Sequence, residues 1–249
     1  MEKVKNRVAI ITGATDEIGS AVCRRLAGKG AIVVAVDTDR EKVDALVAEI
    51  TAGDGRAMAA VIDPTNGEQI KKMIADVVDK VGPIDILVNN FDYLDEKLVD
   101  VVSDEQWHRA FEQNADPIFF LTRAILPDMK TRKYGRVINI GSLSYLGFQG
   151  LSSYAAAKSA LFGLTRSLAL ESARNGVTVN CVAKGDMATA GMDEATIEKC
   201  IKAIPVRRMG KPEDVAKAVG FFASDRSPYV TGQTFFVCGG KSIHFSMSI

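Results

Sequence analysis

Residues that build metal sites and disulfide frameworks are scarce in this sequence. It contains four cysteines with no CxxC pair among them: Cys23, Cys181, Cys200 and Cys238. The two histidines, His108 and His244, lie at no ligand spacing from the cysteines or from each other. We therefore expect neither disulfide bonds nor a structural metal.

An excess of one charge and long hydrophobic runs are also missing. Thirty-one basic residues balance thirty-one acidic residues, so the chain lacks the positive charge with which nucleic-acid-binding proteins neutralise phosphates. No apolar segment is long enough to span a bilayer, and the start of the chain is too polar for a secretory signal. We expect a cytoplasmic protein that binds neither nucleic acid nor membrane.

The 249 residues instead contain seven short apolar runs that are typical of buried strands. These runs do not alternate with polar residues, which indicates a parallel sheet covered on both faces. Segments of helical periodicity, such as 18–28, 41–50 and 66–81, lie between them. The pattern predicts one α/β domain over residues 1–249, a Rossmann-type doubly wound sheet of seven mainly parallel strands flanked by helices. The expected strands are 8–11, 31–36, 57–62, 84–88, 136–140, 177–182 and 234–237.

A glycine-containing turn follows the first expected strand. It reads Thr12-Gly13-Ala14-Thr15-Asp16-Glu17-Ile18-Gly19 and leads into a helix. The N-terminus of such a helix can bind a pyrophosphate through its backbone N–H groups and its dipole. A tight strand-to-helix turn also needs glycine for steric reasons alone, so both explanations stay open.

An aspartate, Asp37, stands at the end of the second expected strand. A carboxylate at this position can accept hydrogen bonds from both hydroxyls of an adenosine ribose, and it would repel the 2′-phosphate of NADP. Asp37 therefore favours NAD. The alternative is that Asp37 only begins a turn in which Asp39 caps the next helix.

Tyr154 and Lys158 are four residues apart in an expected helix and so lie on one helical face. The pKa of a tyrosine is ordinarily about 10, but a neighbouring ammonium favours the phenolate and lowers that pKa. Lys158 can supply this ammonium, and Ser142 ends the fifth expected strand. Taken alone, such a pair is more often a pair of surface neighbours than a catalytic pair.

In their order along the chain, these features resemble those of the short-chain dehydrogenase/reductase family, over nearly the full length. The matching features are Thr12-Gly13 to Gly19, Asp63, Asn89-Asn90, Asn114, Ser142, Tyr154-x-x-x-Lys158 and the segments 205–216 and 230–234. The resemblance implies hydride transfer between a nicotinamide cofactor and a secondary alcohol or ketone.

The resemblance also implies roles for individual residues. Tyr154 is then the acid/base, and Lys158 lowers its pKa and holds the nicotinamide ribose. Ser142 hydrogen-bonds the substrate oxygen, and Asn114 anchors a proton-relay water. The residues expected to bind NAD are Gly13, Thr15, Asp16, Ile18, Gly19, Asp37, Asp63, Asn89, Tyr154, Lys158, Gly185 and Thr189.

A proline supports the role of Asn114. Pro117 lies three residues further on, in a helix expected over about residues 104–131. It lacks the N–H that would bond the carbonyl of Gln113, and its ring crowds that turn. The resulting distortion can free backbone carbonyls for water; the alternative is an incidental kink.

Four departures from the family pattern lie mostly around the expected cofactor site. Glu17 replaces a glycine of the turn, Phe91-Asp92 replaces Ala-Gly, Lys184 replaces a proline, and Cys238 replaces an aspartate. A carboxylate about 5 Å from a pyrophosphate charge costs about 3 kcal/mol at an effective dielectric of about 20, unless it faces water. Two interpretations stay open: an active enzyme, and a non-catalytic subunit with an impaired cofactor site that supports an active paralogue in a heteromer.

The substrate is poorly encoded in the sequence. The lid expected over about residues 186–203 contains no readable motif, and Lys184, Arg207 and Arg208 around it can meet an anionic substrate or remain solvated. The resemblance to the acyl-thioester branch of the family favours oxidation of a 3-hydroxyacyl-CoA in a degradative pathway over a small cyclic or polyol alcohol. It also implies a homotetramer, or a heterotetramer with a paralogous subunit, with contacts at residues 155–170 and after Phe235, including the tail 242–249.

Overall fold

The sheet has seven strands that all run in the same direction. In the computed structural model, which describes residues 2–189 and 191–245, the strand order is β3-β2-β1-β4-β5-β6-β7 and every neighbouring pair is parallel. The Rossmann-type fold is confirmed, and every strand end lies within two residues of its expected position. The strands are β1 (Val8–Thr12), β2 (Ile32–Asp37), β3 (Arg56–Val61), β4 (Ile84–Asn89), β5 (Gly135–Ser142), β6 (Val177–Lys184) and β7 (Thr234–Val237).

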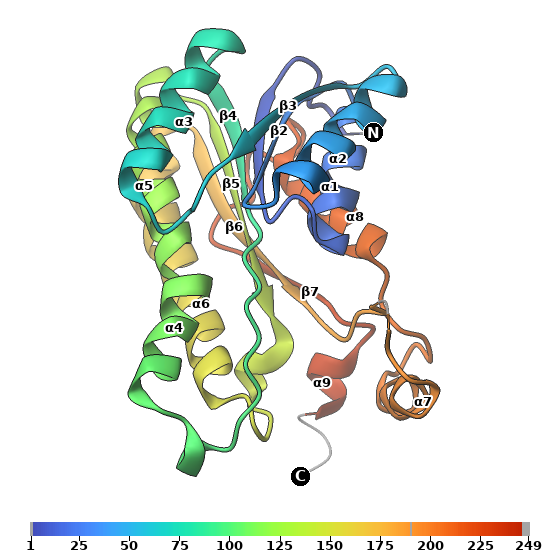
Figure 1. Ribbon diagram of the computed structural model, residues 1–249. Helices are drawn as coiled ribbons and strands as arrows, with labels where there is room; N and C mark the ends of the chain where they lie inside the picture. The colour runs from blue at the N-terminus through green and yellow to red at the C-terminus, as the bar shows by residue number, and fades with distance from the viewer. Residues whose placement is uncertain (1, 190, 246–249) are drawn as a thin grey trace.

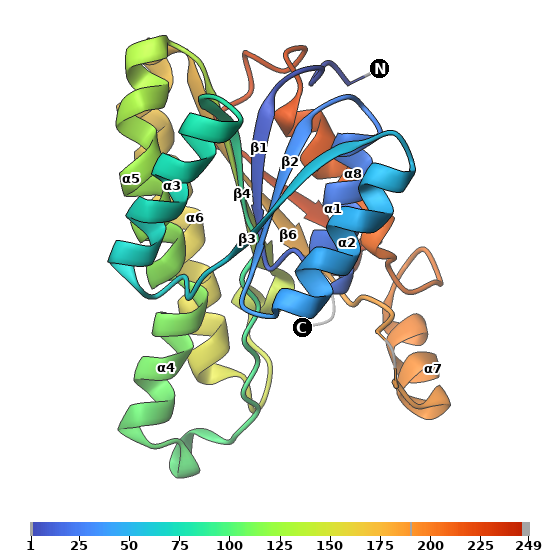
Figure 2. The same cartoon turned by 45° about the horizontal axis from the view of Figure 1, so that its top comes forward.

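Helices cover both faces of the sheet (Figure 2). One layer contains α1 (Glu17–Ala27), α2 (Arg40–Ala52) and α8 (Pro212–Ala223), and the other contains α3 (Gly67–Lys80), α5 (Asp116–Arg132) and α6 (Ser152–Ser172). Successive side chains of a strand point to opposite faces, so Ile11 packs in one apolar cluster and Ile10 in the other. Burial on both faces explains why the strands are continuous apolar runs.

The helix expected over residues 104–131 is divided in two. α4 (Asp104–Asn114) ends at Asn114, and α5 begins after Ala115, whose backbone angles (φ −120°, ψ −48°) are not helical. Pro117 then lies in the first turn of α5, where its missing N–H leaves no helical hydrogen bond unmade. The distortion expected beside Asn114 is confirmed, and it is a complete break.

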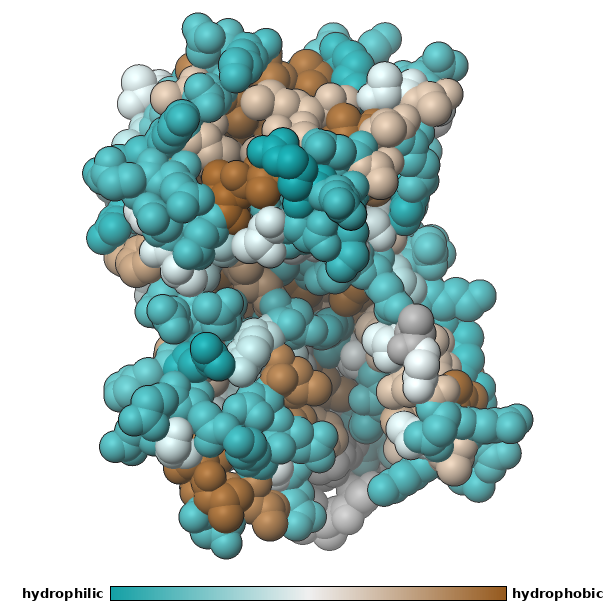
Figure 3. All heavy atoms as spheres, viewed as in Figure 1, coloured by the Kyte–Doolittle hydropathy of each residue, from teal (hydrophilic) through white to brown (hydrophobic). Residues whose placement is uncertain are grey.

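Two helices lie beyond the carboxyl ends of the strands. Figure 1 shows α7 (Glu194–Ala203) standing apart from the layers, and α9 (Lys241–Phe245) lies close to the end of β7. The surface is hollowed between α7 and the part of the molecule that contains α4 (Figure 3). α7 belongs to the expected lid; residue 190 of that lid and residues 246–249 of the expected contact tail lie outside the described residues. Among the described residues, the 3₁₀ helices are η1 (Val99–Val101), η2 (Leu143–Leu146) and η3 (Ala173–Asn175).

All four cysteines are free thiols; Cys200 is half-buried and the other three are buried. Within residues 2–189 and 191–245, no three His, Cys, Asp or Glu side chains form a group that could hold a metal ion. None of the helices in the described chain combines the length and the apolar character of a membrane span.

An ion pair at the start of β4 connects this strand to α5. Asp85 Oδ1 accepts a hydrogen bond from Arg132 Nη1 at 2.9 Å, and Asp85 Oδ2 accepts one from the Val8 N–H at 3.3 Å. Arg132 also donates from Nε to Asp128 Oδ2 at 2.7 Å. Asp85 has 9% of its side chain exposed, against 56% for Asp128. The buried pair anchors the strand whose other end enters the candidate site.

We predict that Asp85→Ala lowers the free energy of unfolding by about 2–3 kcal/mol, because it leaves Arg132 and the Val8 N–H short of a buried partner. Asp128→Ala is the matched control: it removes the other carboxylate from the same arginine, but at an exposed position, and should cost under about 1 kcal/mol. Urea denaturation measures both values. Equal losses for the two variants would contradict this account.

Candidate active site

The expected site residues gather where the carboxyl ends of β1, β4, β5 and β6 meet. The glycine turn follows β1, residues 90–93 follow β4, Ser142 ends β5 and Lys184 ends β6. α6 packs beside β5 and β6 and carries Tyr154 and Lys158. In a doubly wound sheet the ligand is expected at this end of the strands.

The glycine turn is held by Asn90. Its side-chain Nδ2 donates to Gly13 O at 3.1 Å and to Asp16 Oδ2 at 2.9 Å. Gly13 has φ +56°, and a Cβ at this position would lie 2.0 Å from Asn90 O. Glycine is therefore required here by the close approach of two backbone segments, which is the steric explanation for the motif.

Two carboxylates stand at the N-terminus of α1. Asp16 caps the helix by accepting a hydrogen bond from the Gly19 N–H at 2.6 Å. Glu17 is the first residue of α1 and is exposed, so the interpretation that Glu17 lies at the surface of the first helical turn is confirmed. Ile18 packs in the core. The helix end expected to receive a pyrophosphate thus already binds a carboxylate of the chain itself.

Asp37 lies beside the glycine turn and is half-buried. Its Oδ2 accepts hydrogen bonds from Thr15 N at 3.0 Å and from Thr15 Oγ1 at 2.7 Å, and its Oδ1 accepts one from Thr38 N at 2.8 Å. Asp39 caps α2 through Lys42 N, as expected. Asp37 therefore does more than begin a turn, because it connects the end of β2 to the turn after β1.

The other residues expected at the cofactor differ in exposure. Asp63 is exposed and accepts hydrogen bonds from Thr65 N and Oγ1. Thr189 is exposed in the expected lid. Gly185 lies against β7, where a Cβ would come within 2.7 Å of Cys238 Cα. The Asn89 side chain is fully buried and donates to Asn139 Oδ1 at 2.9 Å, so this side chain points into the core, and a cofactor contact of Asn89 stays a prediction.

The structure brings together three side chains that the family resemblance places in one site: Ser142, Tyr154 and Lys158. Their residues are 8%, 5% and 0% exposed. Tyr154 and Lys158 lie one turn apart on α6, and Ser142 at the end of β5 acts to lower the pKa of Tyr154. Ser142 Oγ also accepts a hydrogen bond from Ser144 N at 3.1 Å.

A fourth side chain, Asp92, occupies the space in front of Tyr154 and Lys158. Its Oδ1 accepts a hydrogen bond from Tyr154 Oη at 2.7 Å and lies 3.3 Å from Lys158 Nζ. Its Oδ2 forms an ion pair with Lys184 Nζ. Lys158 Nζ also donates to Phe91 O. We call the side chains of Asp92, Tyr154, Lys158 and Lys184 the Asp92 cluster.

In the Asp92 cluster the pKa of Tyr154 is raised, although the sequence predicts that it is lowered. Burial, and then the adjacent Asp92 carboxylate, raise the pKa of Tyr154 well above its ordinary value. Burial lowers the pKa of Lys158, while the charge of Asp92 acts in the opposite direction. Burial alone would raise the pKa of Asp92, but Lys158 and Lys184 outweigh it and hold this pKa far below its usual range. In this arrangement burial and Asp92 raise the pKa of Tyr154, so the lowering expected from Lys158 does not prevail.

Asn114 holds the chain just after Asp92. Its Nδ2 donates to Tyr93 O at 2.8 Å and to Ala110 O at 2.9 Å, and its Oδ1 accepts from Tyr93 N at 3.0 Å. The buried amide therefore satisfies both backbone groups of Tyr93. Phe91 is half-buried, with its ring against the apolar cluster on the α3 and α5 face.

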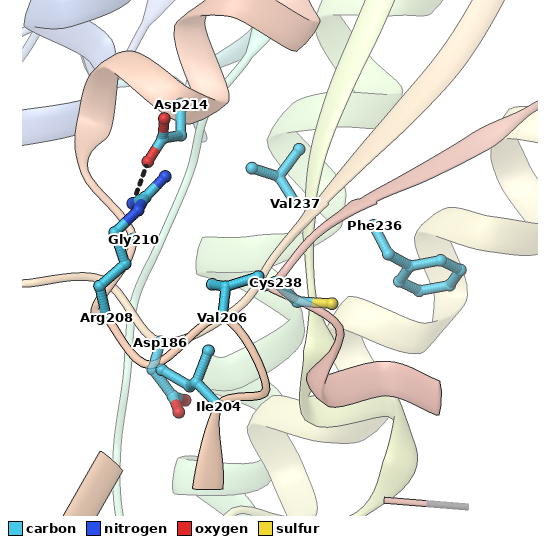
Figure 4. Close-up of a pocket in the computed structure, with 10 residues that line it drawn as sticks. Asp186, Ile204, Val206, Arg208, Gly210, Asp214, Phe236, Val237 and Cys238 are labelled. Carbon is cyan, nitrogen blue, oxygen red and sulfur yellow. Dashed lines mark hydrogen bonds and ion pairs between the residues drawn. The ribbon is translucent and has the colours of Figure 1, made fainter. Parts of the chain in front are cut away.

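A cavity of about 310 Å³ lies between the base of the expected lid and β7 (Figure 4). Its wall includes Ile204, Val206 and Phe236. Arg208 at this cavity forms an ion pair with Asp214 at 2.7 Å, and Arg207 donates to Lys202 O at 2.8 Å. Together with Lys184, the basic residues considered for an anionic substrate thus all bind oxygens of the chain itself.

Asp92 and Lys184 stand in the sequence as two separate departures from the family pattern, and their pairing is not among the expectations. The sequence did contain a signal for this pairing. Asp92 replaces a glycine just after β4, and Lys184, of opposite charge, replaces a proline at the end of β6; β4 and β6 lie on the two sides of β5. Residues at the ends of next-but-one strands are close enough for long side chains to meet. The pairing also connects both departures to Tyr154.

A family profile described as enoyl-(acyl carrier protein) reductase matches residues 13–242. The chain is 45% identical to the (2S)-[(R)-hydroxy(phenyl)methyl]succinyl-CoA dehydrogenase subunit BbsC of Thauera aromatica, over 98% of this chain and 97% of the relative. It is 38% identical to subunit BbsD of the dehydrogenase of the same name from that organism, over 96% and 98%. The 3-oxoacyl-[acyl-carrier-protein] reductase FabG of Haemophilus influenzae is 36% identical, over 95% and 98%.

A solved structure agrees with these matches. A protein of Burkholderia xenovorans described as a short-chain dehydrogenase/reductase has a TM-score of 0.92 and 32% identity, over 98% of this chain and 99% of that protein. The sequence motifs, the strand order and the relatives lead to the same assignment. This chain belongs to the short-chain dehydrogenase/reductase family of oxidoreductases.

Proposed function

We propose that this chain takes part in the NAD-dependent oxidation of a 3-hydroxyacyl-CoA to the 3-oxoacyl-CoA in a degradative pathway. The name of the 45% identical relative, a dehydrogenase subunit for a hydroxy-substituted acyl-CoA, supports the substrate class. Asp37 at the end of β2 supports NAD, because its carboxylate can accept hydrogen bonds from ribose hydroxyls and repels a 2′-phosphate.

The two ends of the expected NAD site differ in how well they fit the cofactor. At the adenosine end, Asp37 is half-buried beside the glycine turn, as a ribose-binding carboxylate should be. At the nicotinamide end, Asp92 binds the Tyr154 hydroxyl and both lysines. This end does not fit a nicotinamide ribose or a substrate oxygen while Asp92 lies there.

The chain therefore has two candidate roles. In the first, Asp92 moves away, and this chain carries out catalysis with Tyr154 as acid/base, assisted by Lys158, Ser142 and Asn114. In the second, the chain is a non-catalytic subunit that supports an active paralogue in a heteromer. The Asp92 cluster is the observation that favours the second role. Two relatives that share one enzyme name as subunits BbsC and BbsD further support a heteromeric assembly.

Contacts between subunits would involve apolar side chains on α6 and β7. Leu170 is 83% exposed, and Phe235 and Phe236 are 40% and 41% exposed. Phe235 stacks on Phe221 of α8, with ring centroids 5.4 Å apart. Exposed aromatic and aliphatic groups of this kind are typical of protein interfaces. They support a tetramer, built from this chain alone or with a paralogue.

For nucleotide preference, we predict that whichever form of the protein binds a dinucleotide prefers NADH to NADPH. Asp37→Ala should narrow this preference, because it removes the repulsion of the 2′-phosphate. Fluorescence titration with both nucleotides measures the two affinities. Tighter binding of NADPH than of NADH by the wild-type protein would contradict the preference for NAD that we assign to Asp37.

For the first role, we predict that Tyr154→Phe reduces turnover of a 3-hydroxyacyl-CoA by about 10²–10⁴-fold, because the ring is kept while the proton-transferring hydroxyl is lost. Circular dichroism should show that the variant remains folded. Near-normal turnover in Tyr154→Phe, with an active wild type, would exclude Tyr154 as the acid/base.

For the second role, we predict that isothermal titration of the isolated chain with NADH detects no binding, and that a paralogous dehydrogenase with the missing glycines co-purifies with it. Glu17→Gly, Phe91→Ala and Asp92→Gly together should recover binding, since Asp37, Asp63 and Lys158 remain. Adding Asp37→Ala to this triple variant is the control and should weaken the recovered binding. Tight binding of NADH by the wild type would eliminate the second role.

For the assembly, we expect multi-angle light scattering to give the mass of a tetramer at micromolar concentration, for the chain alone or with its paralogue. Leu170→Glu should shift the mass to a smaller species, because it places a charge in an apolar contact. A monomeric wild type, both alone and with the paralogue, would contradict the expected assembly.

A further inference from the structure

The ion pair between Asp92 and Lys184 crosses the carboxyl end of β5. Asp92 lies just after β4 and Lys184 ends β6, and β5 lies between these strands in the sheet. The two side chains are 25% and 17% exposed. Partial burial strengthens an ion pair relative to one in water, so Lys184 contributes to where the Asp92 carboxylate lies.

Asp92 has two cationic partners, and they hold it differently. Lys158 has no exposed surface and divides its ammonium between Phe91 O and Asp92 Oδ1, which is 3.3 Å away. Lys184 binds the other carboxylate oxygen, Oδ2. With Oδ2 bound to Lys184, Oδ1 is directed at the Tyr154 hydroxyl.

We infer that Lys184 is a positioning residue, which keeps the Asp92 carboxylate on the Tyr154 hydroxyl, so that the site is closed by the two residues together and not by Asp92 alone. This inference rests on the second role proposed above. It assigns a task to the residue that replaces the family's proline at position 184.

Two explanations of the role of Lys184, positioning of Asp92 and a direct effect of its own charge, predict opposite changes in the pKa of Tyr154 when Lys184 is lost. If Lys184 acts only through its own charge, losing this ammonium disfavours the phenolate, and the pKa of Tyr154 stays high or rises. If Lys184 positions Asp92, its loss lets the carboxylate leave Tyr154. Lys158 then remains beside the phenol and its ammonium lowers the pKa of Tyr154.

The charged groups that bear on this test are few in the described structure. Asp92 comes from the segment after β4, Lys158 from α6 and Lys184 from β6. Asp16 at the start of α1 interacts electrostatically with both Asp92 and Lys184. Ser142 of β5 is a neutral group that acts to lower the pKa of Tyr154.

The test counts phenolates in the full chain by ultraviolet absorbance as the pH is raised. Each protein is compared with the same protein carrying Tyr154→Phe, which isolates the signal of Tyr154. In the wild type we expect no Tyr154 phenolate below about pH 11, one unit above the ordinary phenol pKa of about 10. Lys184→Met should gain one phenolate in this range, and so should Asp92→Asn.

Lys241→Met is the matched control. Lys241 pairs with Asp186 at 2.5 Å, and these side chains are 12% and 25% exposed, close to the values for Lys184 and Asp92. This variant loses a similar ion pair that lies outside the Asp92 cluster, and we expect no gain of phenolate. Lys184→Gln serves as a second variant if circular dichroism shows that Lys184→Met is unfolded.

The inference is overturned if folded Lys184 variants gain no phenolate while Asp92→Asn does, because Asp92 then stays in place without Lys184. It is also overturned if Lys241→Met gains the same phenolate, because the effect is then general loosening of the site. NADH titration of the wild type separately decides the second role. Binding there would reject that role and with it the closed site, whereas the phenolate counts decide whether Lys184 positions the Asp92 carboxylate on Tyr154.

Discussion

Lys158 has no exposed surface, and a buried ammonium requires negative charge or oxygen acceptors within reach. In this chain the segment after β4 provides both, as the Asp92 carboxylate and the Phe91 carbonyl. The same carboxylate accepts a hydrogen bond from Tyr154 and pairs with Lys184. The position of this segment, the state of Tyr154 and the contact with β6 all depend on how the charge of Lys158 is balanced.

This balance changes what the family's catalytic residues can do. A general base works best when its pKa lies near the working pH, and burial, together with the Asp92 carboxylate, moves the pKa of Tyr154 away from that range. The scaffold around the site is nevertheless intact: Asn90 holds the glycine turn, and Asn114 binds both backbone groups of Tyr93. One fold can thus keep the positions of its catalytic side chains while their chemistry is altered.

Much of the fold was predictable from the sequence, because the local preferences of the residues and their burial in the folded chain favour the same elements. The strands are apolar on both faces since helices cover both, and Asp39 caps α2 as a helix start requires. Pro117 indicated a distortion beside Asn114, because a missing N–H and a crowding ring act on the nearest turn whatever the fold, and the structure has a complete break there. Asn89 shows the limit: its place at a strand end was evident, but its side chain turns inward to Asn139.

The sequence by itself determined the order of the strands, a distortion beside Asn114 and the alignment of Tyr154 with Lys158 on one helical face. It also showed that Asp92 and Lys184 are unusual residues near strand ends. Only the tertiary structure decided that these two residues, 92 positions apart, pair with each other while Asp92 binds the Tyr154 hydroxyl. The reason is physical: the sign of a pKa shift depends on which charge lies closest and how far water is excluded. Neither distance nor burial is set until β4, β5, β6 and α6 have packed together.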